Sequence, residues 1–253
     1  MFTRSLTFVA VLLIVLTASA EDLAVAAAAD LNFVLKDIAQ QYQHDTGNTL
    51  KLSFGSSGNF FVEIQNGAPF DLFFSADVAY PQKLEQAGLA EPGTLYRYAV
   101  GKIVLWAPNN SKLDVAKGID VLLDPSIKRI AIANPAHAPY GRAAEQALKK
   151  AGMYDRIKDK LVLGENISQT AQFIQTGNAD IGIIAQSLAV APTMKTKGRF
   201  VEVPGQLYSP IEQGVIILKS SSHKRAARQF LDYLKRPAVR QIMNKYGFAI
   251  PGE

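Results

Sequence analysis

Four short polar segments stand where an apolar strand is predicted to pass directly into a helix. The first is Ala29-Asp30, and the second contains Ser57 within Gly55-Ser56-Ser57-Gly58. The other two contain Tyr140 and residues 165–168. A helix that begins directly after a strand leaves backbone N–H groups unpaired, and such donors bind anions. The sequence therefore predicts anion binding at these strand-to-helix junctions.

Asp30 does not fit a simple anion site. It stands at the expected N-cap of a helix whose apolar stripe runs from Leu31 to Tyr42. An ionised aspartate accepts hydrogen bonds, donates none and repels an anion. Asp30 could cap the helix and point away from the ligand, or it could be protonated or bridged by water and accept a hydrogen from a protonated anion. The third alternative is a different oxyanion, or one accompanied by a cation.

The two junction serines are open to a structural interpretation. Ser57 could be a plain helix N-cap, and Ser168 is expected to cap the helix that runs to residue 175.

The sequence offers little support for metal or thiol chemistry. The chain has no cysteine, which excludes disulfides, thiol catalysis and cysteine-ligated metals. Its histidines, His44, His137 and His223, lie far apart without a His-x-x-x-His pair. We therefore expect neither a metal site nor a cofactor.

Hydrolytic chemistry is a remote alternative. Ser57, His137 and an aspartate could form a triad in an exported hydrolase, but the chain has no Gly-x-Ser-x-Gly segment. Asp30 could pair with Asp71 or Asp77 for acid–base catalysis, although nothing in the sequence brings them together. We therefore do not expect the protein to be an enzyme.

Short apolar strands alternate with amphipathic helices, which predicts an α/β protein with mostly parallel sheets. The pattern occurs twice, and the chain is expected to leave the first half near residue 100 and to return near residue 213. We therefore predict two lobes joined by two crossing strands, with lobe I formed by residues 21–100 and 213–253 and lobe II by residues 101–212. Strands are predicted at residues 49–54, 71–75, 98–107, 129–133, 161–163, 180–185 and 214–218.

The N-terminus is typical of an export signal. Arg4 precedes an apolar run at residues 6–16, and Ala18-Ser19-Ala20 is a small-residue cleavage site, so residues 1–20 are a predicted signal peptide. Removal of Arg4 lowers the formal net charge from +5 to +4, and the basic residues are spread along the chain. We expect a soluble periplasmic monomer that does not bind nucleic acid.

Several longer segments resemble one known family, the periplasmic molybdate-binding proteins of ABC importers (the ModA family of type II solute-binding proteins). The matching segments are residues 26–39, 54–58, 66–77, 134–141, 232–235 and 246–248. The resemblance implies a periplasmic-binding-protein type II fold, whose two lobes close on molybdate or tungstate and present the oxyanion to an inner-membrane ABC permease. It also implies a site of hydroxyl and backbone N–H donors, which disfavours anions that must donate a proton.

The resemblance also assigns the ligand contacts. The family's binding positions fall on Ala29, Asp30, Ser57, Tyr140 and Ile167. Ser56, Asn59 and His137 are expected to lie behind them as supporting residues. Because family members carry Ser, Thr or Asn where this chain has Asp30, the nearest alternative is a binding protein for a different small oxyanion.

Overall fold

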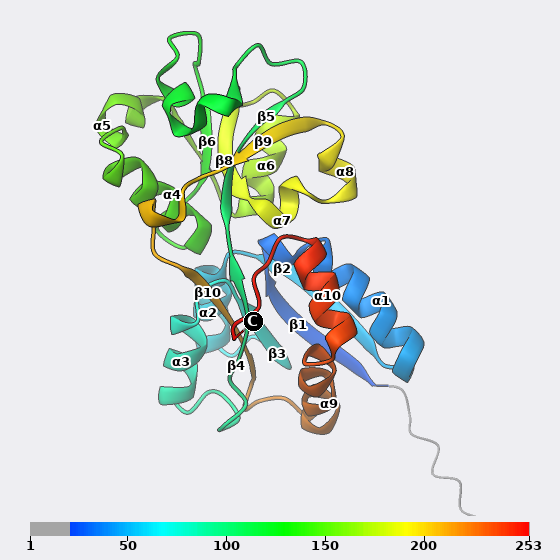
Figure 1. The fold of residues 1–253 in the computed structure, drawn as a ribbon. Helices are drawn as coiled ribbons and strands as arrows, with labels where there is room; N and C mark the ends of the chain where they lie inside the picture. Colours follow the sequence, from blue (N-terminus) through cyan, green and yellow to red (C-terminus); the bar gives the residue numbers. More distant parts are fainter. Residues whose placement is uncertain (1–20, 253) are drawn as a thin grey trace, which may run out of the picture.

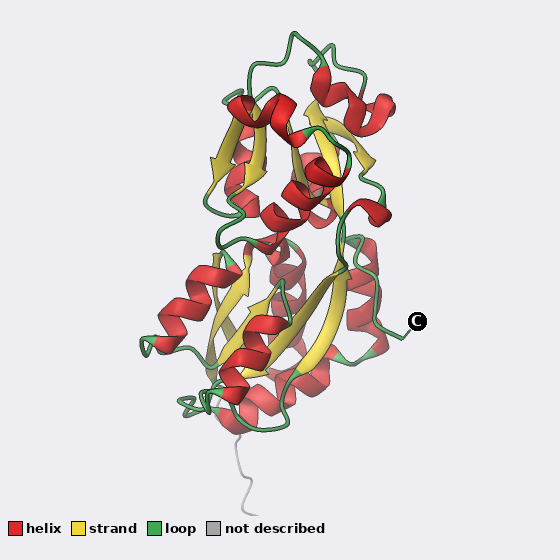
Figure 2. Ribbon diagram, turned by 90° about the vertical axis from the view of Figure 1, so that its left-hand side faces the viewer, coloured by secondary structure: helices red, strands yellow, loops and turns green. Residues whose placement is uncertain are grey.

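The computed structural model of the chain describes residues 21–252 as two α/β lobes, one above the other in Figure 1. The predicted signal peptide, residues 1–20, lies outside the described residues. Each lobe contains a five-stranded sheet flanked by helices (Figure 2). Within residues 21–252, no helix is both long enough and apolar enough to cross a membrane.

Lobe I is built on the sheet with strand order β2-β1-β3-β10-β4. Strand β1 (Asp22–Ala28) is parallel to β2 (Thr49–Gly55) and β3 (Leu72–Ser75). Strand β10 (Ile211–Ile217) is antiparallel to β3 and to β4 (Tyr96–Gly101). The helices of this lobe are α1 (Val34–Thr46), α2 (Ser57–Gln65), α3 (Ala79–Gln86), α9 (Lys224–Leu234) and α10 (Pro237–Lys245), and a 3-10 turn, η1 (Ala29–Leu31), follows β1.

The alternation of side chains along β1 decides which helix packs on which face of the sheet. Val25 and Ala27 are fully buried in one core cluster with Ile38 of α1. Ala26, between them in sequence, belongs to a second cluster with Phe60 of α2. Because neighbouring residues of a strand point to opposite faces, the small residues of β1 allow α1 and α2 to pack on the two sides. Both helices thereby begin near the carboxyl end of the sheet.

Lobe II is built on the sheet with strand order β7-β6-β8-β5-β9. Strand β6 (Ile130–Ala133) is parallel to β7 (Leu161–Gly164) and β8 (Ile181–Ala185), and β5 (Ile103–Pro108) is antiparallel to β8 and to β9 (Gly198–Glu202). The helical segments are α4 (Pro139–Lys150), α5 (Tyr154–Ile157), α6 (Ile167–Gln175), α7 (Gln186–Ala189), α8 (Pro192–Lys195), η2 (Val115–Leu123), η3 (Lys158–Lys160) and η4 (Gly205–Leu207).

Two segments carry the chain between the lobes. The strand predicted at residues 98–107 is divided into β4 and β5, which lie in different sheets and are separated by Lys102. The chain returns through residues 203–210 into β10 (Figure 1). Among the strands of residues 21–252, every antiparallel pairing involves β4, β5 or β10, and the parallel pairings join β1 to β2 and β3 and join β6 to β7 and β8, so both sheets are mixed.

Candidate functional site

A small cavity of about 10 Å³ lies between the lobes. Its walls come from η1 and the N-termini of α2, α4 and α6, which are the four junctions singled out in the sequence. All five predicted ligand-binding residues line it, namely Ala29, Asp30, Ser57, Tyr140 and Ile167. Of the predicted supporting residues, Ser56 also lines the cavity, whereas Asn59 and His137 lie outside its wall.

The α2 junction leaves a hydroxyl donor available to the cavity. Ser56 is the N-cap of α2, and its Oγ accepts a hydrogen bond from the Asn59 N–H at 3.4 Å. The interpretation of Ser57 as the cap was therefore wrong by one residue. Ser57 is fully buried, and its Oγ accepts a hydrogen bond from the Ala76 N–H at 2.9 Å. No acceptor for the Ser57 hydroxyl hydrogen occurs within residues 21–252, so this hydrogen is free to point at a ligand.

The α6 junction presents a backbone donor. Asn166 is the N-cap, and its Oδ1 accepts hydrogen bonds from the N–H groups of Ser168 and Gln169, each at 3.0 Å. Ser168 is therefore not the cap that the sequence predicted. Its hydroxyl instead donates to the Ala29 carbonyl of lobe I at 2.8 Å. Ile167, the first residue of α6, has no intrahelical acceptor for its N–H.

The α4 junction directs Tyr140 toward lobe I. Pro139 occupies the first turn of α4, where a missing N–H costs nothing, and Ala138 provides no side-chain cap. The next residue, Tyr140, is 2% exposed, and its hydroxyl donates to Asp30 Oδ2 across the lobes at 3.0 Å.

Asp30 does not cap a helix, so that interpretation was wrong. It lies within η1, and α1 starts only at Val34, after Phe33, without any side-chain cap. The Asp30 side chain turns inward instead, and the residue is 1% exposed. Its Oδ2 accepts from Tyr140 and, at 2.7 Å, from Gln213 Nε2. Its Oδ1 is buried without a hydrogen-bond partner among the described residues.

Gln213 and Tyr98 complete this buried network, and neither residue was predicted from the sequence. The Tyr98 hydroxyl donates to Gln213 Oε1 at 2.6 Å, and Gln213 Nε2 also donates to the Tyr140 hydroxyl at 2.9 Å. Gln213 is fully buried on β10. A glutamine immediately before the apolar run at residues 214–218 was the available signal, because buried amides require partners.

The network is neutral apart from Asp30. Burial raises the pKa of Asp30 from 3.8 to about 7, although hydrogen bonds from Gln213 and Tyr140 act in the opposite direction. Burial also raises the pKa of Tyr98 and of Tyr140 well above 10, so both remain protonated donors. Among the described residues, no Lys, Arg or His side chain lines the cavity.

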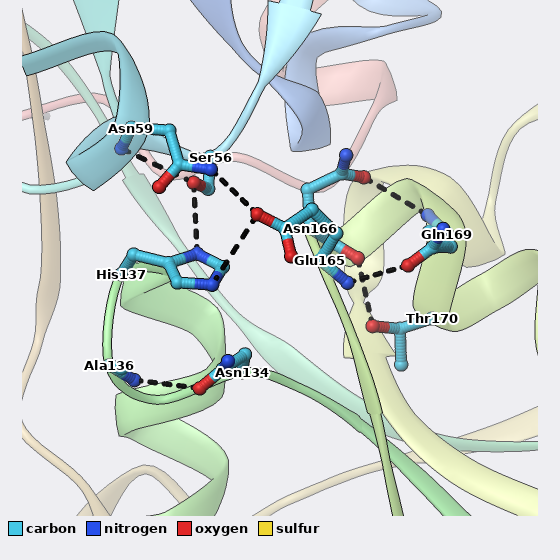
Figure 3. A network of polar contacts seen from close by, with 9 residues as sticks. All are labelled: Ser56, Asn59, Asn134, Ala136, His137, Glu165, Asn166, Gln169 and Thr170. Carbon is cyan, nitrogen blue, oxygen red and sulfur yellow. Dashed lines mark hydrogen bonds and ion pairs between the residues drawn. The ribbon is translucent and has the colours of Figure 1, made fainter. Parts of the chain in front are cut away.

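A second group of polar contacts joins the lobes beside the cavity (Figure 3). Asn59 Nδ2 of lobe I donates to Glu165 Oε1 of lobe II at 2.6 Å, and His137 Nε2 lies 3.5 Å from the same oxygen. His137 Nδ1 is 3.0 Å from Ser56 Oγ, and the Gly58 N–H donates to the His137 carbonyl at 2.9 Å. Asn59 and His137 therefore hold the lobes together.

These contacts also decide between chemical alternatives. His137 contacts Ser56 rather than Ser57, so the triad considered for Ser57 is not formed. Asp71 lies elsewhere and accepts from Ser221, while Asp77 pairs with Arg142 at 2.6 Å. Within residues 21–252, no cluster of three or more His, Asp or Glu side chains could hold a metal ion.

Comparison with known proteins gives consistent matches over both lobes. The family of bacterial extracellular solute-binding proteins matches residues 23–249. The molybdate-binding protein ModA of Azotobacter vinelandii is 42% identical over 238 residues, which is 94% of each chain. ModA of Rhodobacter capsulatus is 40% identical, over 92% of this chain and 90% of that protein. The solved structure of the Azotobacter vinelandii periplasmic molybdate-binding protein superimposes with a TM-score of 0.86 at 35% identity, covering 90% of this chain and 99% of that one.

Proposed function

Because this chain belongs to the family of bacterial extracellular solute-binding proteins, we propose that it captures molybdate or tungstate between its lobes and delivers the oxyanion to an ABC permease. The type II fold predicted from the sequence is confirmed by the match to the Azotobacter structure. The protein acts in the periplasm, after removal of residues 1–20, as a monomer without a cofactor and without catalysis. Lobe I comprises residues 21–101 and 211–252, which keeps β4 and β10 whole, and lobe II comprises residues 102–210; these boundaries differ by one or two residues from those expected from the sequence.

One observation supports this function above the others: the part of the chain that the structure describes offers the cavity donors from both lobes and no cationic side chain. Three helix N-termini point at it, each with partial positive charge and unpaired N–H groups. The donors of this site match a desolvated dianion chemically, because every oxygen of the dianion can accept a hydrogen bond. In the proposed complex the Ser57 hydroxyl and the Ile167 N–H donate from opposite lobes, and Ala29, Asp30 and Tyr140 complete the wall.

The proposal is tested by calorimetric titration of residues 21–253 with molybdate, tungstate, sulfate and phosphate. We expect one molybdate or tungstate per chain, and weaker responses to the smaller sulfate and to hydrogenphosphate, whose hydrogen could be accepted only by an ionised Asp30. A ligand that binds only the folded protein also raises the unfolding midpoint. Absence of both heat and a midpoint shift with molybdate and tungstate would overturn the assignment, and preferential binding of another anion would favour the nearest alternative.

Replacement of Ser57 by alanine should weaken molybdate binding by roughly 10- to 100-fold, because a hydrogen bond to a charged group is worth about 1.5–3 kcal/mol. The change also leaves the Ala76 N–H without its acceptor. Calorimetry of Ser57→Ala measures the loss, and Ser53→Ala, at an exposed serine of β2, is the matched control. Equal affinities of the two variants would remove Ser57 from the site.

A further inference from the structure

We propose that Asp30 binds the oxyanion as a neutral carboxylic acid that donates a hydrogen bond from Oδ1, so that the protein takes up one proton with each dianion. This inference rests on the proposed function and adds the protonation state of Asp30 in the complex. It differs from the possibility that Asp30 accepts a hydrogen from a protonated anion. In the present inference the proton resides on the protein, and the ligand is a full dianion.

The hydrogen bonds within the network identify the oxygen that carries the proton. Oδ2 already accepts from two donors, the Tyr140 hydroxyl at 3.0 Å and Gln213 Nε2 at 2.7 Å. Gln213 is held in this orientation because its Oε1 accepts from Tyr98. Oδ1 has no partner among the described residues, although it is buried and its residue lines the cavity. A proton on Oδ1 therefore meets no competing donor, and the bound oxyanion supplies its acceptor.

Gln213 and Tyr98 act as positioning residues in this arrangement. Both hydrogens of the Gln213 amide are used, one for Asp30 and one for the Tyr140 hydroxyl at 2.9 Å. The Tyr140 hydroxyl hydrogen then goes to Asp30. The network thus fixes the carboxyl group with Oδ2 toward these donors and leaves Oδ1 for the ligand.

The charges around Asp30 favour the neutral form. The titratable groups that face it are Tyr140 of α4 and Tyr98 of β4, and both are uncharged. Helices α6 and α7, which pack against η1, carry no charged residue. Where charged residues do occur on the other neighbouring elements, they are exposed or lie outside the cavity wall. These are Asp22 of β1, Lys36, Asp37, His44 and Asp45 of α1, Lys51 of β2, Glu63 of α2, Arg97 of β4, Glu212 of β10, and Arg142, Glu145, Lys149 and Lys150 of α4.

The effect of pH on binding follows from this environment. Burial raises the pKa of Asp30 to about 7, and a neighbouring dianion raises the pKa further. At pH 8 the free protein therefore has an ionised Asp30, and the complex has a neutral one. Since the complex holds the extra proton, affinity is greatest below pH 7 and weakens as pH rises above it, by up to about tenfold per pH unit.

Calorimetry with molybdate at pH 8, in buffers with different ionisation enthalpies, counts the protons directly. We expect close to one proton per molybdate for the wild type, and none for Asp30→Asn. In that variant the affinity should not vary with pH, because its amide donates without titrating. The number of protons that the wild type takes up per molybdate tests the inference even if Asp30→Asn does not fold.

Each result has a distinct meaning. Molybdate binding by the wild type without proton uptake would overturn this inference and leave the proposed function intact. Uptake that persists in Asp30→Asn but disappears in His137→Gln would assign the proton to the histidine, and would also overturn it. Absence of both molybdate and tungstate binding at every pH from 6 to 8 would overturn the proposed function and this inference with it.

Discussion

The variant Gly58→Ala should fold normally and lose molybdate affinity by about 100-fold or more. A Cβ atom at position 58 would lie 2.7 Å from the carbonyl oxygen and 2.9 Å from the Cα of His137, which belongs to the opposite lobe. Within its own helix, alanine is more favourable than glycine. The clash therefore affects only the arrangement in which the two lobes meet. In the proposed complex Tyr140 and Ile167 reach the ligand only in this arrangement, and each lost contact to a charged ligand costs about 1.5–3 kcal/mol.

Calorimetry with molybdate and thermal unfolding without it test this variant together. Gly205→Ala is the matched control, because no heavy atom lies within 4 Å of the Cβ that it would add. We expect both variants to unfold at or above the wild-type temperature, and only Gly58→Ala to bind weakly. Wild-type affinity in Gly58→Ala would show that binding does not require the lobes to approach as they do in this structure.

The variant Gly141→Ala should instead destabilise lobe II. Here the added Cβ would lie 2.1 Å from the Ala133 carbonyl oxygen and 2.6 Å from its carbon, within lobe II itself. The start of α4 packs directly on the end of β6, and backbone cannot move aside as a flexible side chain can. Overpacking of this kind costs about 3 kcal/mol, which for a chain of this size lowers the unfolding midpoint by roughly 6–12 °C.

Thermal unfolding of Gly141→Ala in the absence of ligand measures this cost, again beside Gly205→Ala. Since Tyr140 immediately precedes Gly141, we also expect weaker molybdate binding in whatever fraction remains folded. A midpoint equal to that of the wild type would mean that α4 can move away from β6 at no cost. Comparison of Gly58→Ala with Gly141→Ala therefore distinguishes an effect on the contact between the lobes from an effect on the stability of lobe II.

The position of the cavity could be predicted because its signals are local. Ser57, Tyr140 and Ile167 each follow an apolar strand and precede an amphipathic helix, and the structure brings all three junctions to one cavity. The predicted caps, Ser57 and Ser168, were wrong by one and two residues. The structure has Ser56 as the N-cap of α2 and Asn166 as the N-cap of α6. Adjacent polar residues can each cap a helix, and only the backbone geometry decides between them.

The role of Asp30 could not be predicted from its neighbours in sequence. Its partners Tyr140 and Gln213 are 110 and 183 residues away, so their contacts depend on how the lobes meet. The antiparallel pairing of β10 with β3 has the same origin, because the alternation of strands and helices does not specify where a returning strand inserts. Long-range partners thus determine whether a polar residue at a junction caps a helix or enters a buried network.

In the proposed complex, a tetrahedral oxyanion lies between the lobes, held by Ser57, Ile167 and Asp30. Crystals of residues 21–253 grown with molybdate, with diffraction recorded at the molybdenum absorption edge, test it most directly. We predict one strong anomalous peak in the cavity, with oxygens within hydrogen-bond distance of Ser57 Oγ, the Ile167 N–H and Asp30 Oδ1. A cavity without such a peak, or molybdenum found only on the surface, would overturn the proposed binding site.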